Sequence, residues 1–110
     1  MSYQNTIIVG NVGREVTSHT TSTGKQVANF SVAVNEKISG ETQTTWFQIA
    51  AWERWAELAV EYVRKGHLLL VEGRIAAETW QDQQGQTQVT LKLTARNIRF
   101  LGSKSEEAEE

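Results

Sequence analysis

Apolar and polar side chains alternate along most of this chain, and a period of two residues is typical of strands with one buried face. The alternation recurs in five segments, which cover residues 3–12, 26–35, 44–52, 67–81 and 87–101. The period changes once, because apolar side chains within residues 53–65 recur at helical spacing, at Trp55, Leu58, Ala59 and Tyr62. The sequence therefore predicts three strands, one helix and two further strands.

Each predicted strand has one apolar face, which we expect to form the core. The inward sets are Ala28, Phe30, Val32 and Val34; Phe47, Ile49 and Ala51; Leu69, Val71, Ile75 and Ala77; and Val89, Leu91, Leu93 and Ala95. The alternation slips near Asn97, where Ile98 and Phe100 change faces, and this predicts a bulge or bend. Trp55 and Tyr62 occupy the core-facing spacing of the helix, so we expect both to pack inward.

The remaining segments carry signals for turns and helix ends. Acids open the helical segment, Arg64 and Lys65 close it, and Gly66 follows, which suits the helix dipole and a glycine stop. Arg64 and Lys65 serve either this helix end or a ligand. The polar stretch 13–25 predicts a loop, residues 36–43 predict a hairpin connection, and residues 82–86 predict a turn.

This order of elements matches an all-β fold, the five-stranded Greek-key OB-fold barrel with one helix between strands three and four. Gly73 lies within the long fourth strand, as a strand that bends round a barrel corner needs. A β-sandwich is the alternative, but it needs more strands than the pattern provides. A chain of 110 residues suits one domain, which we place at residues 1–102, followed by a short acidic disordered tail at 103–110.

The distribution of charge matters more than the net charge of −2. Residues 1–102 carry ten Lys and Arg against nine Asp and Glu, because four Glu and one Lys lie in residues 103–110. A near-neutral body differs from the basic profile of many nucleic-acid binders, so any such affinity must depend on local cations and ring stacking. The chain has no Cys, no apolar run near the roughly 18 residues of a membrane span and no signal peptide, so we expect a soluble cytoplasmic protein.

Catalytic and metal-binding chemistry find little support in the sequence. Asp82 is the only Asp and lies in a predicted turn, while His19 lies in a predicted loop and His67 at a strand start. The segment Gly10-Asn11-Val12-Gly13 follows a strand but lacks the rest of a dinucleotide-binding loop. We therefore expect no enzyme, no metal site and no cofactor.

Three tryptophans lie on the polar faces of their predicted strands. Trp46 and Trp52 share a face with Gln48, and Trp80 shares one with Arg74. Large rings among polar side chains indicate a flat surface that suits a nucleic-acid base. Residues 46 and 52 lie about 20 Å apart along a strand, which spans several bases of an extended strand. Because a duplex hides its base faces, such rings favour unpaired strands.

Four cations are candidates for phosphate contacts near these rings: Lys37, Arg54, Arg74 and Lys92. Other roles stay open for several of the candidate residues. Trp46 or Trp52 could plug a barrel end or a subunit interface. Arg74 could pair with Glu72 or Glu78 across the sheet.

Several motifs carry a resemblance to a known family in the same order and spacing: IIVGNVG (7–13), VANFSVAVN (27–35), TWF (45–47), YVRKG (62–66), VEGR (71–74) and WQDQQGQ (80–86). Over roughly residues 4–102 the chain resembles the bacterial-type single-stranded DNA-binding protein. The resemblance implies that single-stranded DNA stacks on Trp46, Trp52 and Trp80, and that the protein is a homotetramer. It also implies a role in replication, recombination or repair, at the nucleoid.

The chain departs from the family pattern at a few positions. Ile38 stands where the family has a fourth aromatic ring, and Ala76, Glu78 and Thr79 stand where cations are common. These differences imply weaker and less salt-sensitive binding than in a typical member. The family tail ends in a Pro-Phe tip that recruits other enzymes, and residues 103–110 carry no such tip, so we do not expect recruitment by this route.

Two other functions stay open. A diverged OB-fold paralogue could act as a protein-interaction or primosome-like accessory module, which the near-neutral body and the missing tip favour. An RNA-binding OB fold would stack bases equally well, because stacking does not read the 2′-hydroxyl.

Overall fold

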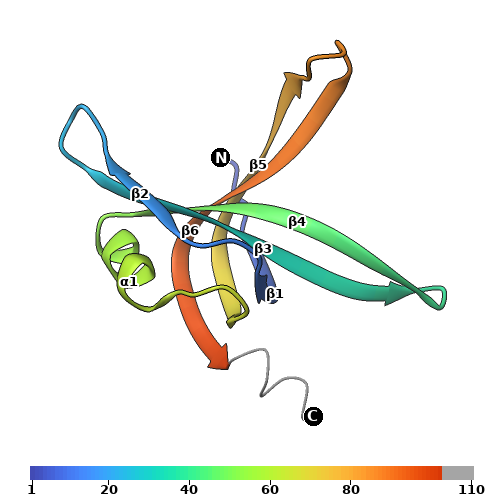
Figure 1. Cartoon of the computed structure of the whole chain (residues 1–110), viewed down its shortest axis with the longest axis horizontal. Coiled ribbons are helices and arrows are strands. Elements are labelled where there is room, and N and C mark those ends of the chain that lie inside the picture. Colours follow the sequence, from blue (N-terminus) through green and yellow to red (C-terminus); the bar gives the residue numbers. More distant parts are fainter. Residues whose placement is uncertain (103–110) are drawn as a thin grey trace.

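The computed structural model describes residues 1–102, which form six strands and one helix (Figure 1). In chain order the elements are β1 (Thr6–Val12), β2 (Thr17–Thr20), β3 (Gln26–Ile38), β4 (Glu41–Trp52), α1 (Arg54–Tyr62), β5 (Leu68–Gln81) and β6 (Thr87–Gly102). The predicted acidic tail, residues 103–110, lies outside the described residues. None of the residues described forms a helix that is long and apolar enough to cross a membrane.

Five of these strands close into a barrel, which confirms the predicted OB-fold class. The hydrogen-bonded order is β1-β5-β6-β4-β3, and β1 returns to pair with β3 through Asn11 and Val12. Paired strands are antiparallel except for β4 and β6, which run parallel. The helix α1 connects β4 to β5 and packs against β3 and β4.

Two polar segments are more regular than the sequence predicted. The predicted loop 13–25 contains β2, whose exposed residues pair with β3 and flank the barrel. The hairpin predicted at residues 36–43 is confirmed, but its connection is shorter than predicted, because β3 and β4 continue to a two-residue turn at Ser39 and Gly40. The φ angles of these two residues are 55° and 82°, as a tight type I′ hairpin turn needs. The β3–β4 hairpin therefore projects farther than predicted (Figure 1).

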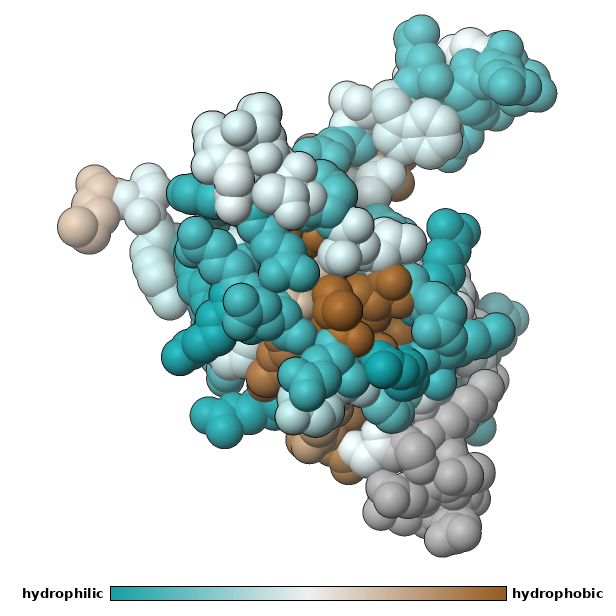
Figure 2. All heavy atoms as spheres, turned by 60° about the vertical axis from the view of Figure 1, so that its left-hand side comes forward, coloured by the Kyte–Doolittle hydropathy of each residue, from teal (hydrophilic) through white to brown (hydrophobic). Residues whose placement is uncertain are grey.

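The core consists largely of the predicted inward faces. Its fully enclosed large side chains are Ile49, Leu69, Leu93, Val32, Val63 and Val71. Val89 and Ala77 were predicted to face inward, but both are exposed because the β5–β6 hairpin extends beyond the barrel and ends in polar side chains (Figures 1 and 2). The core thus ends where this hairpin leaves the barrel.

The helix buries a different stripe from the one predicted. Ala56 and Ala59 face the core, and Trp55 packs partly buried against it, as expected. Tyr62 was predicted to pack inward, but it is 55% exposed and meets Phe100 edge to face. The reason is that α1 ends at Tyr62, earlier than predicted, so the extended Val63 takes the buried place instead.

Arg64 completes the end of the helix. Its guanidinium donates to carbonyl oxygens of the last turn, those of Val60, Glu61 and Val63. These bonds satisfy acceptors that a helix end leaves open. Of the two roles considered for Arg64, the structure therefore supports the helix end.

The bulge predicted near Asn97 is confirmed. The pairing of β5 with β6 moves from Glu72 opposite Asn97 to Gly73 opposite Ala95, so Arg96 is the extra residue. Gly73 allows this close approach, because a Cβ at that position would lie 1.9 Å from the carbonyl oxygen of Thr94. The strands bend here, and the barrel turns into the projecting β5–β6 hairpin.

Candidate nucleic-acid interface

The outward side of β4 carries the first two tryptophans. Trp46 lies opposite Ala33, and Trp52 lies opposite Val27. Because the residues between them alternate into the core, both indoles remain on the surface. Trp46 is 51% exposed and Trp52 is 37% exposed, which confirms the predicted orientation. Neither ring is sealed inside an end of the barrel.

The outward side of β4 continues in register across β6 to β5. In one row, Gln48 of β4 lies opposite Lys92 of β6, which lies opposite Ala76 of β5. The next row consists of Ala50, Thr94 and Arg74. Side chains in register point to the same side of a sheet. The outward-pointing side chains of β3, β4, β6 and β5 therefore form one surface, which we call the outer face.

Trp80 lies on the same side of β5 as Arg74 and Ala76, where the β5–β6 hairpin projects from the barrel (Figure 1). The ring is 51% exposed. Its Nε1 donates a hydrogen bond of 3.0 Å to Oγ1 of Thr90 on the neighbouring strand. This bond orients the indole and leaves its surface open.

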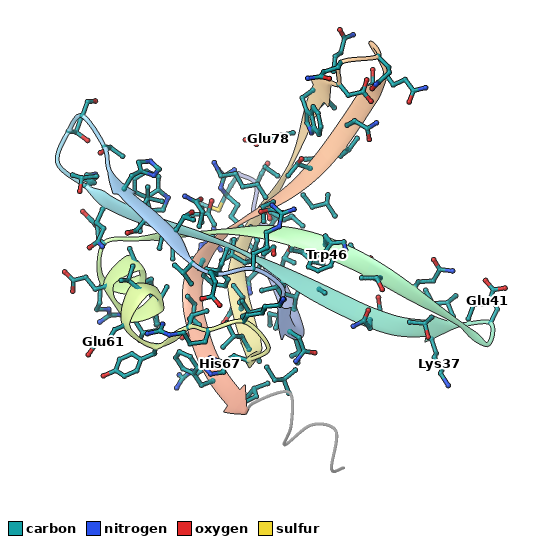
Figure 3. All side chains as sticks on the ribbon, viewed as in Figure 1. Lys37, Glu41, Trp46, Glu61, His67 and Glu78 are labelled. Carbon is teal, nitrogen blue, oxygen red and sulfur yellow. The ribbon has the colours of Figure 1, made fainter. Side chains whose placement is uncertain are left out.

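Three of the four predicted cations lie on the outer face. Lys37 lies near the far end of the β3–β4 hairpin, beyond Trp46 (Figure 3), and Lys92 lies in the middle of the face. Arg74 lines a hollow together with Arg96, a cation that sequence reasoning missed. Arg96 follows Lys92 and Thr94 at alternate positions of β6, so the alternation did give a signal for it.

The fourth predicted cation is placed differently. Arg54 begins α1, after the end of β4. Its guanidinium carbon lies 5.0 Å from the centre of the Trp55 ring, within range of a cation–π interaction. Arg54 therefore lies at the margin of the outer face, in contact with a ring that packs against the core.

Trp46 borders a hollow of about 530 Å³ whose lining includes Asn11, Gly13, Ala33, Asn35 and Lys65. Sequence reasoning did not select Asn11 or Asn35, and it left Lys65 undecided. Asn35 shares the outward side of β3 with Lys37, so the alternation gave a signal for it. Asn11 and Lys65 reach the hollow from β1 and from the segment after α1, so only the folded chain brings them to Trp46.

Gly13 determines where the ring of Trp46 can lie. A Cβ on Gly13 would lie 2.4 Å from Cζ3 and 2.7 Å from Cη2 of that indole. The amide of Gly13 donates to the carbonyl oxygen of Ser31 at 2.9 Å, which continues the pairing of β1 with β3 and fixes the glycine beside β3. The indole therefore rests against backbone that carries no side chain.

Asp82 holds the tip of the β5–β6 hairpin. Its carboxylate accepts hydrogen bonds from the backbone amides of Gln84 and Gln86 and from the side-chain amide of Gln88. The bond from Gln86 and then that from Gln88 lower the pKa of Asp82 most; desolvation opposes them, and Gln84 adds a smaller effect. Asp82 is thus a turn residue. Within residues 1–102, no group of three or more His, Cys, Asp or Glu is placed to hold a metal ion.

Comparison with known proteins gives a consistent result. Residues 3–101 match the Single-strand binding protein family. The "Single-stranded DNA-binding protein 1" of Synechocystis is 32% identical over 111 residues, which cover 99% of this chain and 92% of that protein. The "Single-stranded DNA-binding protein" of Wolinella succinogenes is 31% identical over 107 residues, 93% of this chain and 66% of that protein. Its namesake in Neisseria meningitidis is 31% identical over 96% of this chain and 64% of that protein, so the chain spans about two thirds of these two relatives.

A solved structure shares the fold. The structure described as "Plasmodium falciparum SSB complex with ssDNA" superposes with a TM-score of 0.75 and is 26% identical in sequence. The match covers 92% of this chain and 96% of that one. The structural similarity thus extends over most of both chains.

Proposed function

Because this chain belongs to the single-strand binding protein family, we propose that it binds unpaired DNA without reading its sequence. The observation that carries the proposal is the outer face. Trp46, Trp52 and Trp80 are exposed there on the same side of the paired strands, with Lys37, Arg74 and Lys92 among them. A single strand can lie along this surface with its bases against the rings.

Stacking supplies the main attraction in this proposal. Every base has a flat π-face, so an exposed indole accepts any base, whereas a duplex keeps those faces covered. In proteins of this class, removing a stacking ring costs about 1–3 kcal/mol per base. Trp46 and Trp52 lie about 20 Å apart along β4, so several nucleotides span the two rings.

The cations of the outer face contact phosphates. Lys37, Lys92 and Arg74 flank the tryptophans and neutralise the backbone of the strand, which makes binding weaken as salt increases. Arg54 contributes at the margin, two residues after Trp52 in the chain. The proposal needs no catalytic step and no cofactor.

Tryptophan emission tests the proposal directly. Titration with an oligothymidylate at two salt concentrations should quench the emission, with weaker binding at the higher salt. Trp46→Ala, Trp52→Ala and Trp80→Ala should each weaken binding by about 1–3 kcal/mol. Trp55→Phe is the matched control. Trp55 packs against the core, so this substitution should leave the affinity unchanged. Absence of quenching at low salt would refute the proposal.

An exposed apolar surface supports the homotetramer that the family suggests. Ile7 and Val9 project from β1, and Leu70, opposite Val9 on β5, is only partly covered. Contiguous apolar patches of this kind mark protein–protein contacts. We expect a tetrameric mass in sedimentation equilibrium and a smaller species for Val9→Glu. A wild-type monomer at micromolar concentration would contradict this part of the proposal.

A protein that coats unpaired DNA acts in replication, recombination or repair, and in a bacterial cell it acts at the nucleoid. The alternative is a protein-interaction module, which the near-neutral charge of residues 1–102 favours. The two functions differ in the emission titration. A folded interaction module would leave its tryptophan emission unchanged by oligothymidylate and would instead co-purify with a longer relative.

A further inference from the structure

We propose that the hollow beside Trp46 hydrogen-bonds the edge of one unpaired base while Trp46 stacks on a base face. The inference rests on the proposed function, because it requires a strand on the outer face. It also goes beyond that function, since stacking alone tolerates any base. A site that contacts base edges gives the protein a preference that depends on their hydrogen-bonding groups.

The hollow arises from the sizes of three residues in one row. Asn11 of β1 lies opposite Ala33 of β3, which lies opposite Trp46 of β4. The middle residue has only a methyl group, while an amide and an indole stand on either side of it. The result is a hollow of about 530 Å³ with an aromatic wall and a small floor. Ligand sites typically measure about 300–1,000 Å³, so the hollow has room for part of a nucleotide.

Hydrogen bonds within the protein orient two amides at this hollow. Asn11 Nδ2 donates to the carbonyl oxygen of Gly66 at 3.3 Å, and since a carbonyl only accepts, Oδ1 of Asn11 is left as an acceptor. Asn35 Oδ1 accepts from Oγ1 of Thr44 at 2.5 Å, which leaves its Nδ2 as a donor. One acceptor and one donor are thus held in place before a ligand binds, which lowers the entropy cost of binding.

An acceptor and a donor that line the same hollow suit the edge of a nucleobase. Bases in single strands are recognised through hydrogen bonds to their exposed edges, which carry donors and acceptors side by side. A phosphate offers only acceptor oxygens, which would be repelled by Oδ1 of Asn11, itself an acceptor. An apolar group would leave both amides unmatched. Lys65, which also lines the hollow, suits the phosphate of the same nucleotide.

A nonpolar base analogue separates edge contacts from stacking. The probes are a short oligothymidylate and the same oligomer with every thymine replaced by difluorotoluene, which keeps the shape and the phosphates but hydrogen-bonds poorly. Affinities are measured for the wild type, Asn35→Ala and Asn11→Ala/Asn35→Ala. Gln43→Ala is the matched control, since Gln43 carries an amide in the same hairpin on the opposite side of β4 from Thr44. Circular dichroism confirms that each variant is folded.

The measured quantity is the ratio of the two affinities, thymine oligomer over analogue. We expect this ratio to fall about tenfold in the double variant relative to the wild type, and about threefold in Asn35→Ala. These changes correspond to the loss of two hydrogen bonds and of one hydrogen bond of ordinary net strength. Gln43→Ala should keep the wild-type ratio. Because Asn35 is exposed, its single variant tests the inference even if the double variant does not fold.

The outcomes separate the two proposals. An unchanged ratio in both asparagine variants, with normal quenching by both oligomers, overturns the base-edge site and leaves the stacking function intact. An equal loss of affinity for both oligomers also overturns it, because the amides would then act on the backbone or on the fold. Failure of both oligomers to quench the wild type overturns the proposed function, and this inference with it.

Discussion

A single methyl group at Gly13 tests whether Trp46 must occupy its observed position. The φ angle of Gly13 lies outside the left-handed region, so Gly13→Ala introduces no backbone strain. The added Cβ would meet the indole at 2.4 Å and 2.7 Å. Carbon atoms in contact prefer about 3.5–4.0 Å, so the ring must move by roughly 1 Å or more. Because Trp46 is half exposed, the ring can swing outward. Overpacking a core lowers the free energy of unfolding by about 1–3 kcal/mol, and we expect Gly13→Ala to lower it by less than that.

The cost should therefore fall on binding. A displaced ring loses its alignment with the base, so Gly13→Ala should weaken oligothymidylate binding by up to the full stacking term of about 1–3 kcal/mol. A double-mutant cycle with Trp46→Ala isolates this effect, with fluorescence anisotropy of a labelled oligomer as the assay. In the Trp46→Ala background, Gly13→Ala should cost nothing further. An equal cost in both backgrounds, or no cost in either, would refute the reasoning that Gly13 acts by positioning this ring.

Three further predictions concern the hairpin tip, the barrel corner and the charges. Asp82 has a lowered pKa in the folded state, so its contribution to stability is present above its unfolded pKa of about 3.8 and is lost as pH falls through the lower folded value. The protection of the Gln86 amide from exchange, corrected for the intrinsic rate at each pH, should fall over this range, and Asp82→Ala should remove that fall. Gly73→Ala should lower the free energy of unfolding in urea by at least about 1–3 kcal/mol, because the contact at 1.9 Å is with backbone, and a neutral result would show that the corner relaxes freely. Lys92→Ala should reduce the slope of log K against log salt by about 0.7, whereas an unchanged slope would place Lys92 away from phosphate.

The sequence was most informative where one side of a strand is buried. Along β4 the apolar residues Phe47, Ile49 and Ala51 can satisfy the core only from one side, so the alternation places Trp46 and Trp52 outside without any knowledge of the partner strands. The order of strands and helix then leaves few closed arrangements, and the barrel follows. Burial of apolar surface dominates these choices, and apolar surface is what a sequence pattern displays directly.

Polar segments that are held together by backbone hydrogen bonds show no alternation of apolar residues in the sequence. β2 buries nothing and exists because its backbone pairs with β3, so its Thr and Ser residues were indistinguishable from a loop. The outer end of the β3–β4 hairpin is also polar, and its length depends on the turn at Ser39 and Gly40. Asn11 and Lys65 joined the site of Trp46 through the register of β1 with β3 and the path after α1, which no local pattern specifies.

The balance of charges explains why small residues matter as much as cations on this surface. Ten cations against nine acids in residues 1–102 produce little net field at a distance. In physiological salt the Debye length is about 8 Å, so Lys37 and Lys92 act only on phosphates that already lie close to them. The strength of binding must then come largely from ring contacts, and ring contacts depend on placement within a fraction of an ångström. Gly13, which lets the indole of Trp46 lie close against backbone, and Ala33, which leaves room beside it, are therefore as much part of the interface as the tryptophan itself.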